Sequence, residues 1–368
     1  MGSEIGARGG GRNYGVDLLR LVSMCFVVIL HTLGQGGVLA AAPEGSAVYL
    51  SGWYLEALSF CAVDIFALIS GYVGFSAEPR PTKLSSWILL WLQVVFYGVA
   101  LTLAFHFLRP DTVALKDLRG MYFPVKNDLY WYFTAYTGLF AVKPLLDAGL
   151  RSVGEQTARR VFLAVFLVFS AFDLFFPHFK LASGYCFAWI ALLYVMGGAM
   201  RKCGIGKNLR PAAALGGIVI LSLLTWAWKV FGKLLPKALG RIDMVSYVSP
   251  TVLAAAILFL LCFARLRPGK ALRAVIGFAA PGAFAVYLIN TNRFVWTLVM
   301  KDRFVPLAEK PAAAMICAVL GFTLAFTAVS VGIDALRQAL VRLLRIRKLA
   351  EAADRVVTRC VDWAARRL

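Results

Sequence analysis

Three side chains able to carry chemistry are spaced along one face of the first apolar segment. Asp17, Arg20 and His31 stand in a stretch whose other residues are almost all apolar. At about 100° per residue, a helix places Arg20 within about 20° and Asp17 within about 40° of the direction of His31. Charged groups in a bilayer core cost roughly 2.5–3.5 kcal/mol each, so this stripe should face the interior of a helix bundle or a cavity.

A second apolar segment places an acidic side chain at nearly the same depth. Asp64 lies close to the middle of this segment, and consecutive helices joined by a modest loop usually pack as neighbours. We therefore expect Asp64 to pair with His31, fix the imidazole tautomer and stabilise its protonated form, as in a catalytic dyad. The structural alternatives are a helix cap for Asp17, an arginine extended to the headgroups for Arg20, and a bridge between two helices for His31.

The composition requires a hydrocarbon environment for the elements that position these residues. Hydrophobic residues make up 60% of the 368-residue chain and charged residues 16%, where a soluble domain has roughly 25% charged residues. We therefore predict an all-α integral membrane protein with about ten transmembrane helices in one bundle. The helices are expected at residues 18–40, 57–76, 84–107, 130–147, 160–177, 185–200, 212–232, 248–264, 280–299 and 311–333.

Positive charge predicts how these helices are oriented. Lys and Arg are concentrated in the loops on one side, whereas the first loop on the other side, 41–56, has neither. By the positive-inside rule, the basic loops and both termini are cytoplasmic. This scheme places one basic loop on the outer side of the membrane, the loop with Lys229, Lys233, Lys237 and Arg241. The alternative for this segment is a short interfacial helix.

The chain is accordingly divided into a cytoplasmic lead at 1–15, a transmembrane domain at 16–335 and a cytoplasmic tail at 336–368. The tail is rich in Arg with Leu, Val and Ala between, which predicts an amphipathic helix on the anionic lipids of the inner leaflet. A solvated tail is the alternative.

The remaining composition excludes other classes of site. The net charge of +20 follows from membrane topology, and no nucleic-acid-binding motif accompanies it. The seven cysteines form no Cys-x-x-Cys pair and the three histidines are far apart, so we expect neither disulfides nor a metal site.

Five short motifs follow one another along residues 13–335. They are Asp17-Leu-Leu-Arg20 with His31-Thr32; Val63 to Tyr72; Trp131-Tyr132 with Lys143-Pro144-Leu145-Leu146; Trp189 with Tyr194, Gly197, Gly198 and Arg201; and Val286-Tyr287-Leu288-Ile289. In this order they resemble the bacterial membrane acyltransferases of the acyltransferase 3 family. One departure is Asn290, where relatives commonly have His; Asn can hydrogen-bond but cannot act as a base.

The resemblance implies transfer of an acyl group, usually acetyl, from acetyl-CoA to a hydroxyl of a surface or lipid-linked carbohydrate, in the bacterial cytoplasmic membrane. Some members carry a fused extracytoplasmic esterase-like domain. None is evident in this chain, which would act alone, as a homo-oligomer or with a separate extracytoplasmic partner. A transporter or flippase for a lipid-linked sugar is the main rival function, and a non-catalytic scaffold is a second.

Roles follow for the donor and the reacting centre. Basic residues that would meet the phosphates of acetyl-CoA are Arg20, Arg80, Lys83 and Arg201. His31 would act as general base on the acceptor hydroxyl or form a transient acyl-histidine. Asp64 would orient His31, and Asn290 or Tyr287 would donate to the developing oxyanion.

Aromatic residues predict where the acceptor binds. Trp131, Tyr132 and Tyr136 cluster at the expected outer mouth, where their faces could stack on sugar rings. The alternative is the aromatic belt of the membrane interface. Asp17, Ser70 and Gly71 are expected to have structural roles.

Overall fold

The computed structural model describes residues 12–79, 82–236, 242–365 and 367. Every regular element within these ranges is a helix, so the all-α prediction is confirmed. Most of the expected lead, together with Arg80, Lys237 and Arg241, lies outside the described residues.

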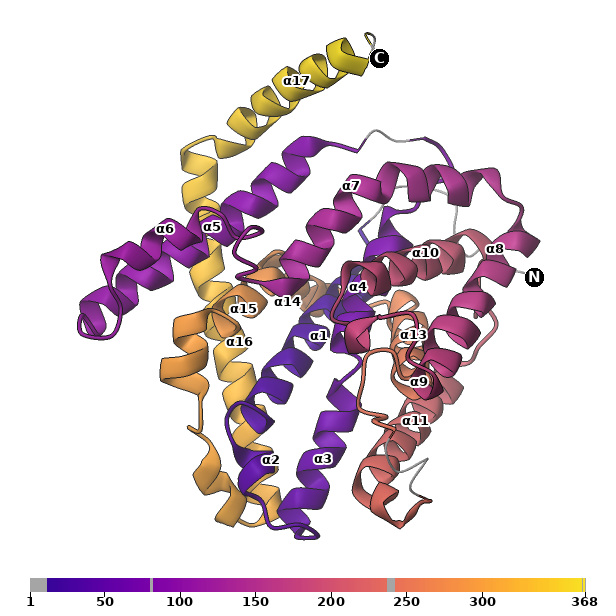
Figure 1. The fold of residues 1–368 in the computed structure, drawn as a ribbon, viewed down its shortest axis with the longest axis vertical. Helices are drawn as coiled ribbons and strands as arrows, with labels where there is room; N and C mark the ends of the chain where they lie inside the picture. Colours follow the sequence, from indigo (N-terminus) through magenta and orange to yellow (C-terminus); the bar gives the residue numbers. More distant parts are fainter. Residues whose placement is uncertain (1–11, 80–81, 237–241, 366, 368) are drawn as a thin grey trace.

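The helices follow one another along the chain with short 3₁₀ and π turns between them (Figure 1). They are α1 (Tyr14–Leu33), α2 (Val38–Ala41), α3 (Ala47–Ser59), α4 (Ala62–Gly74), α5 (Leu84–Leu108), α6 (Leu118–Met121), α7 (Trp131–Ser152), α8 (Glu155–Ala164), α9 (Asp173–Phe175), α10 (Phe187–Cys203), α11 (Pro211–Phe231), α13 (Pro250–Ala264), α14 (Lys270–Ala279), α15 (Ala283–Asn290), α16 (Ala312–Leu343) and α17 (Ile346–Ala365).

Six stretches of the described chain are long and apolar enough to cross a membrane, which makes this a multi-pass membrane protein. They are Tyr14–Ala41, Ala47–Gly74, Leu84–Leu108, Pro211–Leu234, Lys270–Asn290 and Ala312–Leu343. The other four expected spans are also helical, in α7, α8 to α9, α10 and α13, but they are shorter or carry more charge.

Two of these stretches begin ten residues earlier than expected. The second starts at Ala47 rather than 57, because Ser46 caps α3 by accepting a hydrogen bond from the Tyr49 amide at 3.1 Å. The expected span at 280–299 is replaced by Lys270–Asn290, and α15 ends at Asn290.

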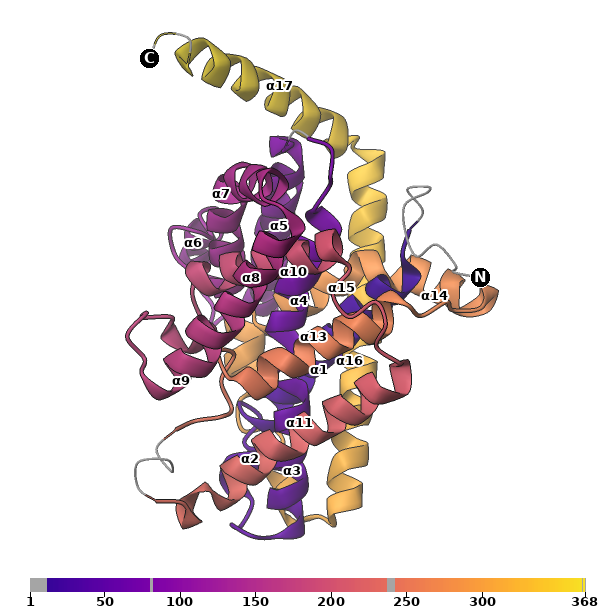
Figure 2. The same cartoon turned by 90° about the vertical axis from the view of Figure 1, so that its right-hand side faces the viewer.

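Helix α4 lies in the middle of the bundle, packed against α1, α10 and α13 (Figures 1 and 2). Its closest neighbour is α10, because glycines replace side chains where the two backbones meet. A Cβ added at Gly71 would lie 1.9 Å from the Tyr194 carbonyl oxygen, and one added at Gly197 would lie 2.1 Å from that of Leu68. The structural role expected for Gly71 is therefore to let α4 and α10 approach.

Helix α17 lies across one end of the bundle, beyond a break after α16 (Figure 2). A carboxylate of Asp354 in α17 accepts a hydrogen bond from the Ser85 amide of α5 at 3.1 Å, and this bond lowers the pKa of Asp354. The expected boundary between domain and tail, 335–336, falls within α16.

The Gly71→Ala variant should be destabilised by roughly 3 kcal/mol or more, because overpacking already costs about 1–3 kcal/mol where neighbouring side chains can move, and here the neighbour is backbone. Gly149→Ala is the matched control, since nothing lies within 4 Å of a Cβ at Gly149. This control should keep or slightly raise the melting temperature. Thermal unfolding in detergent measures both, and equal melting temperatures would contradict the packing described.

Candidate active site

His31 lies in the last turn of α1, where it meets the end of α15. Its Nδ1 is hydrogen-bonded to Oδ1 of Asn290. With the Asn290 amide in this orientation, Nδ1 is assigned as the donor, because a carbonyl oxygen can accept but not donate. The ring also packs edge-on against Trp296, with 4.6 Å between ring centroids. This arrangement leaves the lone pair of Nε2 as the basic site of the imidazole.

Asp64 is paired with a different residue from the one expected. Its Oδ1 accepts a hydrogen bond from Nε1 of Trp189 at 3.0 Å, and both side chains are fully buried. The predicted pairing of Asp64 with His31 is therefore wrong in the structure. The cause is the close packing of α4 on α10, which sets the α4 carboxylate beside α10.

A small cavity of about 60 Å³ lies beside His31. It has room for a few water molecules, and so for a hydroxyl or acetyl group rather than a whole sugar. The lining residues are Met24, Val27, Leu30, His31, Val63, Phe66, Trp131, Tyr132, Tyr185, Tyr247, Phe284, Tyr287 and Thr291. The site is thus a largely apolar chamber with one imidazole and several phenols in its wall.

Polar atoms near this chamber are only partly satisfied. The Tyr287 hydroxyl accepts a weak hydrogen bond, 3.4 Å, from the Tyr132 amide, which leaves its own proton free to donate. Among the described residues, the Tyr132 hydroxyl and Nδ2 of Asn290 are buried without a hydrogen-bond partner. Unsatisfied buried donors are costly, and they are characteristic of sites that bind a polar group.

Aromatic rings connect the chamber with the surface. Trp131 has Tyr185 at 4.9 Å and Tyr247 at 6.4 Å between ring centroids, and these two tyrosines are themselves 4.9 Å apart. Tyr185 is 49% exposed. Tyr136 does not line the chamber. It lies four residues after Tyr132 on α7, close enough to Arg20 for electrostatic interaction.

The sequence analysis assigned no role to Trp189, Trp296, Tyr185 or Tyr247. Trp189 stood in one of the motifs but had no partner assigned to it. Tyr185 and Tyr247 lie between helices, and Trp296 lies in a short π-helix, Val295–Met300, so the 3.6-residue period of an α-helix does not indicate which way these side chains face.

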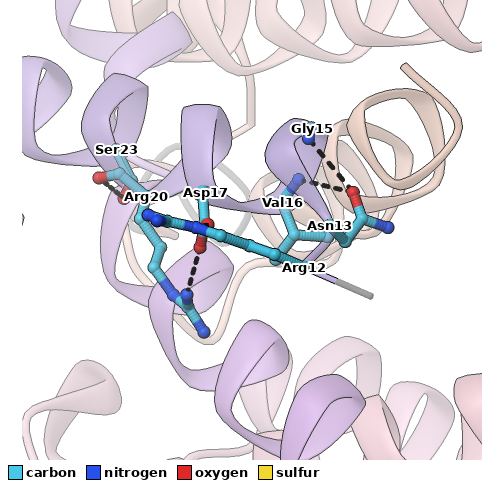
Figure 3. A network of polar contacts seen from close by, with 7 residues as sticks. All are labelled: Arg12, Asn13, Gly15, Val16, Asp17, Arg20 and Ser23. Carbon is cyan, nitrogen blue, oxygen red and sulfur yellow. Dashed lines mark hydrogen bonds and ion pairs between the residues drawn. The ribbon is translucent and has the colours of Figure 1, made fainter. Parts of the chain in front are cut away.

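Asp17 and Arg20 form an ion pair at the start of α1, with 2.6 Å between Oδ1 and the guanidinium (Figure 3). The other oxygen of Asp17 binds Nε of Arg12 at 2.5 Å. The cap of α1 is Asn13, whose Oδ1 accepts from the amides of Gly15 and Val16, so the expectation that Asp17 caps this helix is wrong. Asp17 lies one turn further into the helix, where the ion pairs with Arg12 and Arg20 offset the cost of burying its carboxylate.

The other expected residues make contacts of their own. Arg201 packs over the ring of Tyr72, 5.5 Å from its centroid, and Lys83 is exposed at the start of α5. The Ser70 hydroxyl donates to the Phe66 carbonyl within α4, a local structural role. In the part of the chain that the structure describes, no three His, Cys, Asp or Glu residues come together as metal ligands.

A separate buried carboxylate, Asp147 of α7, is held by an ion pair within α7 and by a hydrogen bond from α10. Asp147 accepts from Lys143 at 2.5 Å and from the Tyr194 hydroxyl at 2.7 Å. Lys143 and Tyr194 belong to two of the sequence motifs and bind the same carboxylate, and Tyr194 is the partner that joins α10 to α7.

The family model described as an acyltransferase domain, acyltransferase 3, matches residues 13–334. This range begins at the Asn13 cap and ends at Asp334 in α16, so it contains the whole chamber. Comparisons with curated proteins and with solved structures gave no match.

Proposed function

The chain belongs to the acyltransferase 3 family and is a membrane acyltransferase, and from that premise we propose that it transfers acetyl from cytoplasmic acetyl-CoA to a hydroxyl of a cell-surface or lipid-linked carbohydrate. The observation that carries the proposal is His31 in the wall of a small chamber, with its ring held from behind by Asn290. A base of this kind, next to a space that admits a hydroxyl and a thioester, suits acyl transfer.

His31 acts as the general base. Nε2 takes the hydroxyl proton as the acceptor oxygen bonds to the thioester carbonyl carbon; the C–S bond then breaks, and the proton passes from His31 to the departing CoA thiolate. General base catalysis contributes roughly 10²–10⁴-fold. The Asn290 oxygen holds the ring throughout, because Nδ1 keeps its proton in both states of the imidazole.

Developing charge on the carbonyl oxygen needs a donor. The Tyr287 hydroxyl lines the chamber, and Nδ2 of Asn290 is a buried donor without a partner among the described residues. Preorganised donors of this kind are worth about 2.7–4 kcal/mol in other acyl-transfer sites. Asp64 is a positioning residue in this scheme, since it holds Trp189 rather than touching the imidazole.

Donor and acceptor approach from opposite sides. Arg20 lies about 16 Å from His31 along α1, at the distance expected between the phosphates and the thioester of an extended CoA. Arg80, Lys83 and Arg201 would add positive charge on that side. The rings of Trp131, Tyr185 and Tyr247 would stack on the acceptor sugar, with Tyr132 deeper and Tyr136 placed toward the donor.

This direction of transfer implies a topology. We propose ten membrane crossings, both termini in the cytoplasm, and the bacterial cytoplasmic membrane as the location. The support is the concentration of Lys and Arg in alternate loops and in α17.

The His31→Ala variant should lose transfer by at least about 10²-fold, because its base is removed, while the fold and CoA binding are kept. His178→Ala is the matched control, since His178 is exposed and does not line the chamber. Transfer of labelled acetyl from acetyl-CoA to glycan acceptors measures the effect. A folded His31→Ala protein with near-normal transfer would rule His31 out. If the wild type neither transfers acetyl nor binds CoA, transport of a lipid-linked sugar becomes the better account.

The Arg20→Ala variant should weaken CoA binding by roughly tenfold or more, the size of a lost charge-assisted contact to phosphate. Arg12→Ala is the matched control, because it removes the other partner of Asp17 and keeps Arg20. Calorimetric titration with CoA measures both. Equal CoA affinities in the two variants would mean that Arg20 only forms its ion pair with Asp17 and has no role in binding CoA.

A further inference from the structure

A long groove runs along α5 between α16 and the start of α17, separate from the chamber at His31. Its volume is about 1300 Å³. Figure 1 shows α5 crossing α16 below α17, where this groove lies. The proposed acyl transfer uses no residue of this groove.

The floor of the groove is apolar. Residues of α5 from Ser86 to Leu103 line it, which corresponds to about 26 Å along the helix axis. One leaflet of a bilayer core is about 15 Å thick. The apolar α5 side chains in the lining are Leu89, Leu90, Leu92, Val95, Phe96, Val99 and Leu103. The groove is therefore long enough to hold a lipid acyl chain over its whole depth in one leaflet.

The end of the groove nearest α17 is strongly basic. Its cations are Arg337, Arg342, Arg345, Arg347 and Lys348, and Glu351 is the acidic residue that lines it. Arg337 is bound to the buried Asp334 at 2.6 Å. Within the described ranges, none of the other four cations forms an ion pair. This end thus carries surplus positive charge that an anion can neutralise.

The Asp334 network fixes the walls of the groove. Asp334 is fully buried and accepts hydrogen bonds from Tyr97 at 2.9 Å and Gln338 at 2.7 Å, and a longer one from Gln93 at 3.3 Å. It therefore ties α5 to α16 and holds Arg337 at the groove wall. The groove is a built feature and does not depend on a flexible surface.

Arg345 stands at the break between α16 and α17 with φ of +53°. Glycine is the usual residue at such a left-handed helix end, because it has no side chain to strain. A long cationic side chain at this position keeps a charge at the mouth of the groove at some cost to the backbone. A functional role for the charge would explain why the strain persists.

We propose that this groove binds an anionic phospholipid of the leaflet on which α17 lies. The acyl chains lie along α5, and Arg342, Arg345 and Lys348 bind the headgroup phosphate. Arginine suits a phosphate because its planar fork can donate to two oxygens. Neither the apolar floor nor the basic mouth alone selects this ligand; an anionic amphiphile satisfies both.

The test uses the full chain in detergent, with native mass spectrometry to measure binding of phosphatidylglycerol and of phosphatidylcholine with the same acyl chains. Phosphatidylglycerol should bind at least about tenfold more tightly and raise the melting temperature, whereas inorganic phosphate should compete weakly. Equal binding of the two lipids would overturn the proposal. Displacement of the lipid by millimolar phosphate would show a plain anion site and would also overturn it. Occupation of the groove by a second copy of the chain, seen as a dimer that excludes lipid, would do the same.

Arg345→Gly is the most informative variant, because it removes the charge and relieves the backbone at once. It should fold at least as well as the wild type yet bind phosphatidylglycerol about fivefold more weakly, the usual contribution of one cation near an anionic lipid. Arg355→Ala in α17 is the control, because Arg355 is exposed and lies outside the groove. Unchanged lipid preference in Arg345→Gly, or an equal loss in Arg355→Ala, would contradict the proposed site. Neither result bears on acetyl transfer.

Discussion

Hydrocarbon offers no hydrogen-bond partner to a polar side chain, so every polar group inside this bundle depends on another part of the chain. The buried carboxylates show how the constraint is met. Asp64 is held by Trp189, Asp147 by Lys143 and Tyr194, and Asp334 by side chains of α5 and α16. The contacts of Trp189, Tyr194 and the α5 side chains join helices far apart in the sequence, whereas Lys143 and the α16 partners of Asp334 lie on the same helix as the carboxylate that they bind.

The same constraint determines what surrounds His31. Because Asp64 is bound by Trp189, the imidazole receives a neutral amide, Asn290, as its partner. A neutral acceptor fixes the tautomer without the strong preference for imidazolium that a carboxylate would give. In the proposed mechanism, Asn290 stands where the family resemblance led us to expect His, and as a neutral partner it leaves the imidazole ready to accept a proton.

Local geometry made part of this site predictable from the sequence. Asp17 and Arg20 are three residues apart, so any helix brings them together, and their ion pair follows from spacing alone. The all-α class follows equally directly from the apolar composition. The partner of Asp64 could not be predicted this way, because it depends on which side of α4 meets α10.

Packing between distant segments decides which side of α4 meets α10. Gly71 and Gly197 allow the two backbones to touch, and their contact turns Asp64 toward Trp189. Tyr185 and Tyr247 reach the chamber from segments without helical periodicity, so no sequence pattern indicates their direction. The span boundaries shifted for a similar reason: caps such as Ser46 decide where a helix begins, and hydropathy does not detect them.

In the proposed site, Asn290 holds His31 as the Nδ1–H tautomer and leaves Nε2 free as the base. Nitrogen-15 NMR of histidine-labelled protein tests this directly, in a background with His106→Gln and His178→Gln so that His31 is the one remaining imidazole. We expect a protonated Nδ1 and an unprotonated Nε2 near neutral pH, with this preference lost in Asn290→Ala. A protonated Nε2 in the wild-type site would contradict it, because the lone pair that must accept the hydroxyl proton would not be there.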